Sequence, residues 1–539
     1  GISKYSHHMD DRVLYSRMNF QYLQCLDLIN PKYVEKFNQK NREYDILNPE
    51  NDGKIVKLAR YSTDFVEKII GNDEVAVMKY LGIHNTEDME KETSKYIKAI
   101  LINSEMLNDI SVRKMLKRKI NKTIEMMKYG KIYVKGFYHT VIGDIFGYLE
   151  FAAGQEPIGT LKYGEFHAQT LPLGEVTSMR SPLVDPSEVN NVILTNTKLT
   201  DEYLKHFKGQ DIVMINMYDL SMQQQGGMDE DGDSVLLTDE ELIVESKINL
   251  PIVVDLTDKE TADELPYNNE SRIGEITNVA TGVLNIVTDN EKYKKVIEDN
   301  IALLRLYQGK EIDFLKTGSR WHLTSYMLDY LKRLPYFLLF NYPNKKKVYD
   351  ELVKIKRSKK IGNEKIETNA YHSPSQMNEL CDYICTWEKH KVEWDKVSLK
   401  TRDLLVNHNY EYTNRKLMRE IKRIYNEYAQ EINKINDKDK VESVRKKYIG
   451  KLEELQIKNE LIYSLFADYN ITSAYSSVSV NKSLCWYVYG DIMIDNLKNN
   501  TSNPNSKNRQ LVECEPSDAT TEFLGRHYEI VEVESKIAE

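Results

Sequence analysis

Several features are scarce or absent in this 539-residue sequence, and each absence excludes a class of protein. The longest apolar runs, such as Tyr336-Phe337-Leu338-Leu339-Phe340, are far shorter than the roughly 20 residues that a membrane-spanning helix needs. The first residues, which begin with Gly1 rather than Met, include no apolar stretch, so we expect no signal peptide there. The five cysteines form no C-x-x-C pair, which disfavours a zinc site. We therefore expect a reducing, cytoplasmic setting and no membrane partner.

Positive charge is also in deficit, because the formal net charge is -9 at pH 7. A negative net charge argues against a nucleic-acid partner at first. A nucleic-acid enzyme needs a basic channel rather than a basic average, however, because phosphate attraction is local and is screened within about 8–10 Å. Two basic runs could line a nucleic-acid channel: residues 113–119 with Lys122, and residues 345–365. A solvated helix face is the alternative interpretation of each run.

The hydrophobic periodicity changes twice along the chain and predicts an α+β protein of about two to four packed units. Helical spacing gives way, from Lys131, to short alternating or β-branched runs separated by Gly and Pro, and it returns after about Thr277. The runs at residues 131–137, 192–194, 212–215, 235–237 and 252–254 are typical of a small barrel or sandwich. We predict a helical region over residues 1–125, a barrel over 126–260, a head- or clamp-like helical region over 261–500 and a tail over 501–539.

The sequence Asp229-Glu230-Asp231-Gly232-Asp233 places three alternating aspartates within five residues. Carboxylates this close repel one another, and a divalent cation would stabilise both their ionised state and their proximity. Gly232 lets the backbone turn so that all three can face one ion. At this point a solvated acidic turn, a catalytic metal site and a calcium loop are all open. The calcium pattern places Glu240 at position 12, but it needs glycine where Ser234 stands and helices where the flanks indicate strands.

A longer stretch upstream of this loop resembles a known polymerase motif. Residues 176–188 resemble the Arg-Asn-Pro-Cys-Leu-His-Pro-Gly-Asp stretch of the cellular RNA-silencing RNA-dependent RNA polymerases, in which an Asp-x-Asp-Gly-Asp loop follows, as it does here. Ser181 replaces the family's usual Asn and Asp185 its His, whereas Arg180 stays in register. Further segments match the family in its order: residues 18–23, 131–150, 161–169, 276–278 and 311–318.

The chain thus resembles the two-barrel RNA polymerase superfamily, in the branch shared by the silencing enzymes and single-chain phage DNA-dependent RNA polymerases. The resemblance covers about residues 15–320 and implies a double-psi β-barrel flanked by helices. It implies that Asp229, Asp231 and Asp233 bind Mg²⁺, for which Mn²⁺ can substitute, in a two-metal mechanism. It also implies that Arg180 contacts the ribose of the incoming nucleotide and that Lys316 approaches its phosphates.

The resemblance further implies a nucleic-acid template, an RNA product, nucleoside triphosphates and a companion barrel that carries catalytic lysines. That barrel would lie before residue 1, so we expect another polypeptide or a removed N-terminal portion to supply it. The Asn-, Lys-, Ile- and Tyr-rich composition suggests an AT-rich mobile element, so we predict a phage-like, DNA-dependent RNA polymerase of the host-cell cytoplasm or the virion. An RNA-dependent polymerase of the silencing type shares every motif quoted, and a non-catalytic metal- or nucleic-acid-binding subunit is the third hypothesis.

Overall fold

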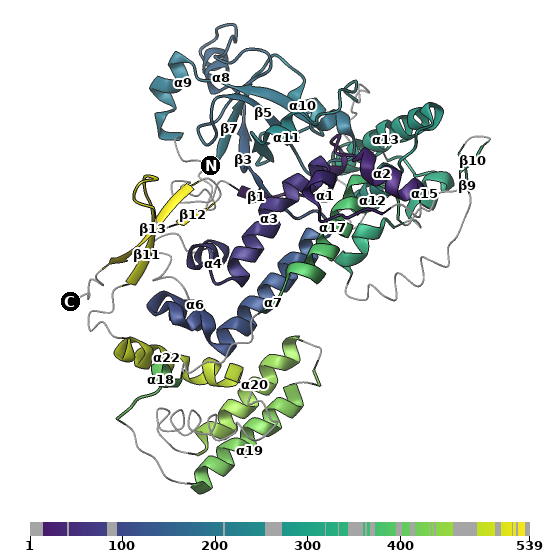
Figure 1. Ribbon diagram of the computed structural model, residues 1–539. Helices are drawn as coiled ribbons and strands as arrows, with labels where there is room; N and C mark the ends of the chain where they lie inside the picture. The colour runs from purple at the N-terminus through teal and green to yellow at the C-terminus, as the bar shows by residue number, and fades with distance from the viewer. Residues whose placement is uncertain are drawn as a thin grey trace. The chain divides into compact units, whose positions relative to one another are not determined.

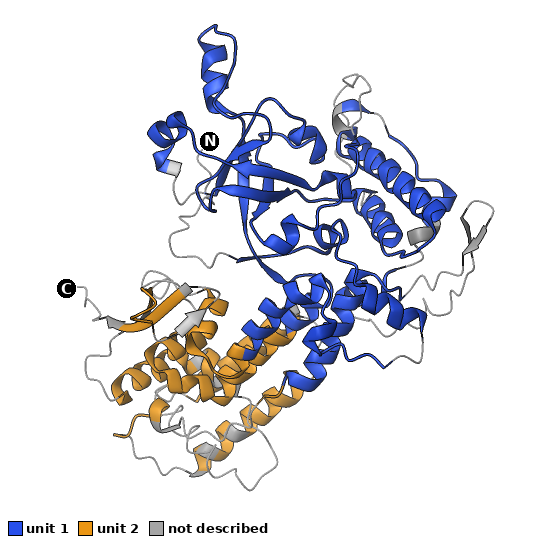
Figure 2. Cartoon of the chain, turned by 45° about the horizontal axis from the view of Figure 1, so that its top comes forward, with its two compact units in different colours: residues 1–67, 122–392 blue, residues 68–121, 393–539 orange. Residues whose placement is uncertain are grey.

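The computed structural model describes most of the chain, which Figure 1 shows as a ribbon. The described residues are 15–39, 43–82, 94–207, 211–253, 272–318, 320–331, 334–342, 359–361, 364–366, 372–394, 402–409, 415–432, 434–435, 438–455, 482–501, 508–519, 521–523 and 526–533. The chain divides into two compact units, which Figure 2 colours separately. Unit 1 comprises residues 1–67 and 122–392, and unit 2 comprises residues 68–121 and 393–539.

Unit 1 is built around a closed six-stranded β-barrel. Its strands are β3 (Phe137–Ile142), β4 (Glu165–His167), β5 (Gly174–Met179), β6 (Asn190–Leu194), β7 (Ile212–Ile215) and β8 (Ser234–Thr238). They follow the order β3-β7-β4-β6-β5-β8, with the pairs β3–β7 and β4–β6 parallel and the other pairs antiparallel. Closure of the barrel pairs every strand on both sides and so leaves no sheet edge exposed.

Apolar side chains from all six strands fill the barrel. In β3, buried and exposed residues alternate, because successive side chains of a strand point to opposite faces of the sheet. β-Branched and aromatic residues dominate the interior, as expected for side chains that pack well on a pleated surface. The buried members of this core are Phe137, Val141, Phe166, Ala168, Leu171, Val176, Val192, Leu194, Val213, Ile215, Met228, Val235 and Leu237.

Short elements precede, connect or follow the barrel strands. They are β1 (Tyr15–Arg17), β2 (Tyr133–Lys135), α8 (Ile145–Ala152), η3 (Pro186–Glu188), α9 (Lys198–Tyr203), η4 (Lys205–Phe207), α10 (Ser221–Gln224) and α11 (Glu241–Val244). Asp144 begins α8, because its Oδ1 accepts hydrogen bonds from the N–H groups of Phe146 (3.1 Å) and Gly147 (3.4 Å). β1 and β2 pair with each other outside the barrel.

The remaining helices of unit 1 precede and follow the barrel in sequence. They are α1 (Phe20–Gln24), α2 (Pro31–Asn38), η1 (Pro49–Asn51), α12 (Arg272–Leu284), α13 (Glu291–Ile312), α14 (Phe314–Thr317), α15 (Ser325–Leu331), η5 (Tyr336–Asn341) and α17 (Gln376–Lys391), with the hairpin of β9 (Lys359–Ile361) and β10 (Glu364–Ile366). α12, α13 and α15 share a second apolar core that includes Val279, Leu304 and Met327. The long helices α3 (Lys54–Ile70) and α7 (Ile110–Met127) each contribute residues to both units.

Unit 2 combines helices with a small antiparallel sheet. Its other elements are α4 (Glu74–Leu81), α6 (Lys95–Ile102), η2 (Ser104–Asn108), α18 (Arg402–Leu405), α19 (Arg415–Ile432), α20 (Lys438–Glu453), α22 (Lys482–Asn500), β11 (Asn508–Glu513), β12 (Thr521–Phe523) and β13 (Arg526–Val533). The three strands form one sheet in the order β11-β13-β12. In that sheet Leu511 lies opposite Ile530.

The predicted α+β class, with a barrel flanked by helices, is confirmed. The runs at residues 192–194, 212–215 and 235–237 lie in strands as predicted, but Ile252 and Val253 lie in no strand, and Val254 lies outside the described residues. The sheet of β11 to β13 was not predicted, because its strands are fixed by pairing with one another, which local periodicity does not reveal. No helix among the described residues is long and apolar enough to cross a membrane.

Glu379 of α17 provides a pH-dependent test of this fold. Its side chain is fully buried, and burial raises its pKa to about 7, although a hydrogen bond from Asn30 (2.6 Å) opposes the rise. A carboxyl whose folded pKa is raised contributes stability that is present below its unfolded pKa and is lost as pH rises through its folded pKa. Between pH 5 and 8 the wild-type protein should therefore lose on the order of 3 kcal/mol relative to Glu379→Gln. Thermal unfolding midpoints of both proteins, measured across this pH range, give the difference. Midpoints that change with pH in the same way in both proteins would contradict the prediction.

Candidate metal centre

The acidic loop of residues 229–233 lies between α10 and β8 and is fixed at both ends by the barrel. Met228 precedes the loop, is buried in the barrel core, and donates its N–H to the carbonyl of Met222 (2.9 Å). β8 begins directly after the loop and buries Val235 in the same core. The N–H of Val141 in β3 donates to the carbonyl of Asp233 (2.9 Å). The loop is therefore held at one end of the barrel by β3 and β8.

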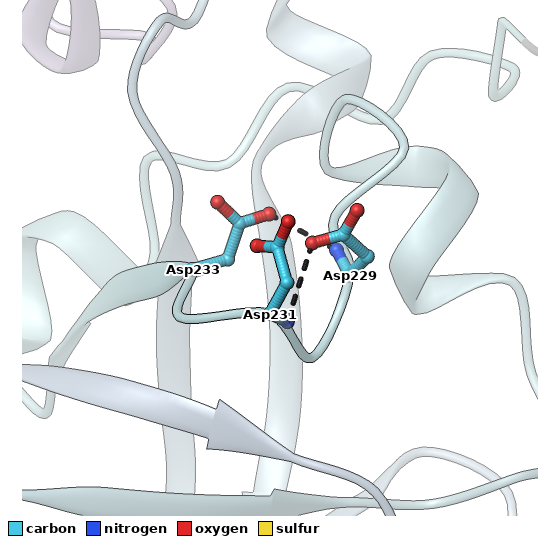
Figure 3. A group of neighbouring side chains, drawn as sticks. All are labelled: Asp229, Asp231 and Asp233. Carbon is cyan, nitrogen blue, oxygen red and sulfur yellow. Dashed lines mark hydrogen bonds between the residues drawn. The ribbon is translucent and has the colours of Figure 1, made fainter. Parts of the chain in front are cut away.

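Asp229, Asp231 and Asp233 turn their carboxylates toward one another in this loop (Figure 3). Each contributes one oxygen, and these three atoms lie within 4.8 Å of one another. The N–H of Asp229 donates to Oδ2 of Asp233 (3.0 Å), and the N–H of Asp231 donates to Oδ1 of Asp229 (3.4 Å). Gly232 has a φ of +129°, which only glycine adopts without strain. The loop backbone thus brings together the three side chains that the sequence predicts to share an ion.

A set of three carboxylate oxygens fits a hard divalent cation. Mg²⁺ takes oxygen ligands and usually keeps several waters, so it is held by a few carboxylates rather than by a closed cage of side chains. Asp231 is exposed, and Asp229 and Asp233 are half-buried. Water and a phosphate-bearing ligand can therefore reach an ion bound between them, and the residues present fit Mg²⁺.

Glu240 does not belong to this cluster. It lies beyond the far end of β8, whose five residues span roughly 16 Å, and it precedes α11 as its N-terminal cap residue. A calcium loop of the EF-hand type needs the residue at position 12 to bind the same ion as the aspartates. The calcium-loop interpretation is therefore wrong for this segment.

Arg180 follows β5 and lies beside the loop because β5 pairs with β8. Its Nη2 forms an ion pair with Oδ2 of Asp233 (2.8 Å). Its Nη1 donates to the carbonyls of Gln225 (3.2 Å) and Gly226 (3.3 Å). One guanidinium thus joins the end of the acidic loop to the segment that precedes it. Contact of Arg180 with a nucleotide stays a prediction.

Glutamine side chains, which the sequence analysis did not identify, hold the segment before the loop. Gln225 donates to the hydroxyl of Ser178 (2.9 Å) and accepts a hydrogen bond from it (3.2 Å). Gln224 donates to the carbonyls of Ser187 (2.7 Å) and Val189 (3.2 Å). The one available signal is the run Gln223-Gln224-Gln225 directly before the loop, and polar runs of this kind are more often solvated.

A buried ion pair lies behind this segment and was also missed. Oε1 of Glu188 in η3 and Nε of Arg305 in α13 are 2.7 Å apart, and both side chains are less than one-tenth exposed. Oε2 of Glu188 accepts hydrogen bonds from the N–H groups of Val184 and Asp185, both at 2.9 Å. Burial raises the pKa of Glu188 to about 7, although Arg305 and these N–H groups oppose the rise. The two partners are far apart in sequence, so no local pattern connects them.

Other segments that carry the family resemblance support this end of the barrel. Oδ2 of Asp144 accepts hydrogen bonds from the N–H groups of Thr160 (2.6 Å) and Leu161 (2.9 Å), which ties the loop before β4 to the start of α8. Oε1 of Gln21 in α1 accepts a hydrogen bond from the hydroxyl of Ser181 (3.2 Å), directly after Arg180. Four of the matching segments thus contact one another in pairs.

Two predicted elements are not placed by the structure. Lys316 lies in α14, but its side chain lies outside the described residues. Most of the basic run over residues 345–365 also lies outside the described part of the chain. Their approach to phosphate or template stays a prediction.

The chain is similar in sequence to a phage polymerase. It is 26% identical over 482 residues to the DNA-directed RNA polymerase YonO of Bacillus phage SPbeta, and the alignment covers 85% of this chain and 52% of that protein. The chain therefore spans about half the length of this relative, and the similarity indicates distant homology.

A solved structure also shows weak similarity to the chain. The RNA dependent RNA polymerase QDE-1 from Thielavia terrestris matches with a TM-score of 0.43 and 13% identity, over 91% of this chain and 57% of that chain. No family model matches the sequence.

Two adjacent glycines before the loop allow a test of the position of Arg180. Gly226 and Gly227 both have positive φ (+83° and +65°), but a Cβ on Gly226 would lie 2.9 Å from Nη1 of Arg180, whereas a Cβ on Gly227 would meet nothing within 4 Å. Both alanine variants should pay roughly 1–2 kcal/mol of backbone strain. Gly226→Ala should cost more, because it also displaces Arg180. Denaturant unfolding of both variants measures the costs, and equal losses would contradict this geometry.

Proposed function

We propose that this chain is the catalytic-aspartate part of a template-directed RNA polymerase that is DNA-dependent and phage-like. The observation that carries the proposal is the cluster of Asp229, Asp231 and Asp233, whose ligand oxygens lie within 4.8 Å of one another at one end of the barrel. Distant homology to a phage DNA-directed RNA polymerase supports the same reaction class and favours a DNA template over RNA. A template-swap extension assay distinguishes the two templates.

In the proposed reaction, the 3′-hydroxyl of the growing RNA attacks the α-phosphorus of a nucleoside triphosphate and displaces pyrophosphate. Bound Mg²⁺ ions would supply activation of the hydroxyl and neutralisation of the leaving group. Asp229, Asp231 and Asp233 would hold the tightly bound ion. Because Met228 and β8 fix both ends of the loop, the carboxylates are arranged before substrate arrives, which lowers the reorganisation needed for catalysis.

Arg180 and Lys316 are the proposed substrate-binding residues. Arg180 is half-buried and anchored by two backbone carbonyls, so its guanidinium is already ordered beside the aspartates. An ordered guanidinium loses little conformational entropy when it binds a ribose hydroxyl. Lys316 lies in α14, and the family resemblance assigns it to the triphosphate.

A companion polypeptide or N-terminal portion that carries the lysine-bearing barrel is part of this proposal. The surface around α8 supports a protein partner, because Tyr148, Leu149 and Phe151 are between 60% and 72% exposed. Ile158 and Tyr163, on the loop before β4, are also mostly exposed. Exposed apolar clusters of this kind mark interaction surfaces in proteins that are otherwise polar outside.

The α8 surface also lies close to the proposed metal centre. A Cβ added to Gly143, between β3 and α8, would collide with the side-chain carboxylate of Glu230, so the backbone at Gly143 lies against the acidic loop. The segment over residues 144–163 carries three acidic residues and one lysine, a balance that disfavours nucleic acid as the occupant. A partner protein docked on α8 would therefore stand next to the aspartates and could complete the site.

The basic face of α7 is proposed to contact the nucleic-acid backbone. Lys114, Lys117 and Arg118 are exposed and follow i, i+3, i+4 spacing, so they share one face of the helix. None of them forms an ion pair with a described residue, whereas cations of α19 and α20 are paired with glutamates. Val112, Met115 and Leu116 on the same helix are buried, so α7 has little apolar surface to insert into a membrane.

Asp231→Ala should abolish nucleotide addition while leaving the fold intact, because it removes a proposed ligand whose side chain is exposed and lies outside the barrel core. The measurement is Mg²⁺-dependent incorporation of labelled ribonucleotides by the chain together with its companion barrel. Glu202→Ala, which removes an exposed carboxylate on α9, is the control and should retain wild-type synthesis. Retained metal-dependent synthesis in Asp231→Ala would refute the assignment.

Replacing Lys114, Lys117 and Arg118 together by alanine should weaken nucleic-acid binding and flatten its salt dependence. Each lost phosphate contact lowers the slope of log K against log salt by about 0.7–0.9, so three contacts predict a decrease of about 2–3. Fluorescence anisotropy with a labelled oligonucleotide in EDTA measures this without catalysis. The matched control removes Arg423, Lys447 and Lys451, which are paired with glutamates. Equal slopes for the two triple variants would count against the α7 face.

A further inference from the structure

The backbone of residues 223–226 lies between two buried or half-buried arginines. Arg305 of α13 pairs with Glu188 (2.7 Å), and its Nη2 donates to the carbonyl of Gln223 (3.5 Å). On the other side, Nη1 of Arg180 donates to the carbonyl of Gly226 (3.3 Å). A long helix in the region after the barrel is thus connected to the segment that leads into the acidic loop.

Gly226 is the point at which the three charged groups meet. A Cβ at this position would lie 2.9 Å from Arg180, 3.6 Å from Glu188 and 3.9 Å from Arg305. Two guanidinium groups so close together repel each other strongly where water is largely excluded. The carboxylate of Glu188 pairs with Arg305 and lies near the same point, so its negative charge offsets part of this repulsion. Glu188 therefore helps to keep Arg180 on Asp233.

We infer that Arg305, acting through Glu188, is a positioning residue that sets the affinity of the aspartate cluster for its divalent cation. Groups behind a metal ligand orient it, and their loss typically weakens metal binding by about 10- to 100-fold. Here the ligand affected is Asp233, because Arg180 holds its Oδ2 at 2.8 Å and is itself fixed by the backbone that Arg305 and Glu188 support. The inference rests on the proposed metal site and adds α13 to the residues that control it.

A purely structural role for the pair makes a different prediction. A buried ion pair that only stabilises the fold would lower thermal stability when broken, as any such pair does, without a specific effect on metal affinity. Glu311 provides the matched comparison, because it is a buried carboxylate on the same helix, paired with Arg272 (3.2 Å) and Arg320 (2.8 Å). No contact connects Glu311 to the acidic loop among the described residues.

The experiment measures Mn²⁺ affinity by electron paramagnetic resonance of free Mn²⁺, with the thermal midpoint recorded for each protein. Glu188→Gln should bind Mn²⁺ about tenfold more weakly than the wild type, whereas Glu311→Gln should stay within about twofold. Arg305→Lys should show an intermediate loss, because lysine keeps the charge but cannot serve Glu188 and Gln223 together. If Glu188→Gln does not fold, Arg305→Lys carries the comparison.

The outcomes separate this inference from the proposed function. Wild-type Mn²⁺ affinity in folded Glu188→Gln or Arg305→Lys would overturn the inference, and so would an equal loss in Glu311→Gln. Asp231→Ala, measured in the same way, should lose Mn²⁺ binding. If Asp231→Ala instead keeps it, the metal site itself is misassigned and the proposed function fails. If only Asp231→Ala loses binding, the site stands and Arg305 has no positioning role.

Discussion

The ion pair between Arg180 and Asp233, at 2.8 Å, offsets the charge repulsion among three carboxylates whose ligand oxygens lie within 4.8 Å of one another. It exists because β5 and β8 are neighbours in a closed barrel, so that the residue after one strand meets the residue before the other. The same closure buries Met228 and Val235 on either side of the loop. The barrel therefore concentrates negative charge at one end and provides the cation that holds it there. A divalent ion can use this arrangement because oxygen ligands are already gathered.

Polar groups from distant parts of the chain extend this support outward in layers. Gln224 and Gln225 fix the segment before the loop through Ser178 and two carbonyls after Asp185. Behind them Glu188 pairs with Arg305, which belongs to a helix with its own apolar core shared with α12 and α15. The buried side chains of Glu188, Gln224 and Gln225 each have a partner in this network, which offsets the cost of burying them. Arg305 thus connects a helix after the barrel to the segment before the loop through Glu188 and the carbonyl of Gln223.

Charge and exposed apolar surface are distributed unevenly over an acidic protein. The net charge is -9, yet one face of α7 carries three exposed cations, Lys114, Lys117 and Arg118. None of the three forms an ion pair with a described residue. Around α8 the pattern is reversed, with exposed Leu149 and Phe151 in a segment where acids outnumber bases. Such separation favours different partners for different surfaces, since phosphate binding depends on local charge and protein docking on buried apolar area. In the proposed polymerase these partners are the template and the companion barrel.

The sequence by itself was sufficient for the α+β class, for three of the six barrel strands and for the candidate aspartates, because alternation, Gly and Pro spacing and the acidic motif are local signals. It left the calcium interpretation open, and only the position of Glu240 beyond β8 removed it. Neither Glu188 nor Arg305 was identifiable, since their pairing joins segments on opposite sides of the acidic loop in sequence. The sheet of β11 to β13 was hidden because pairing between its strands, rather than local periodicity, fixes them. Local periodicity indicates which face of an element is buried. Ion pairs and strand pairing depend on which other element covers that face, and only the tertiary structure decides this.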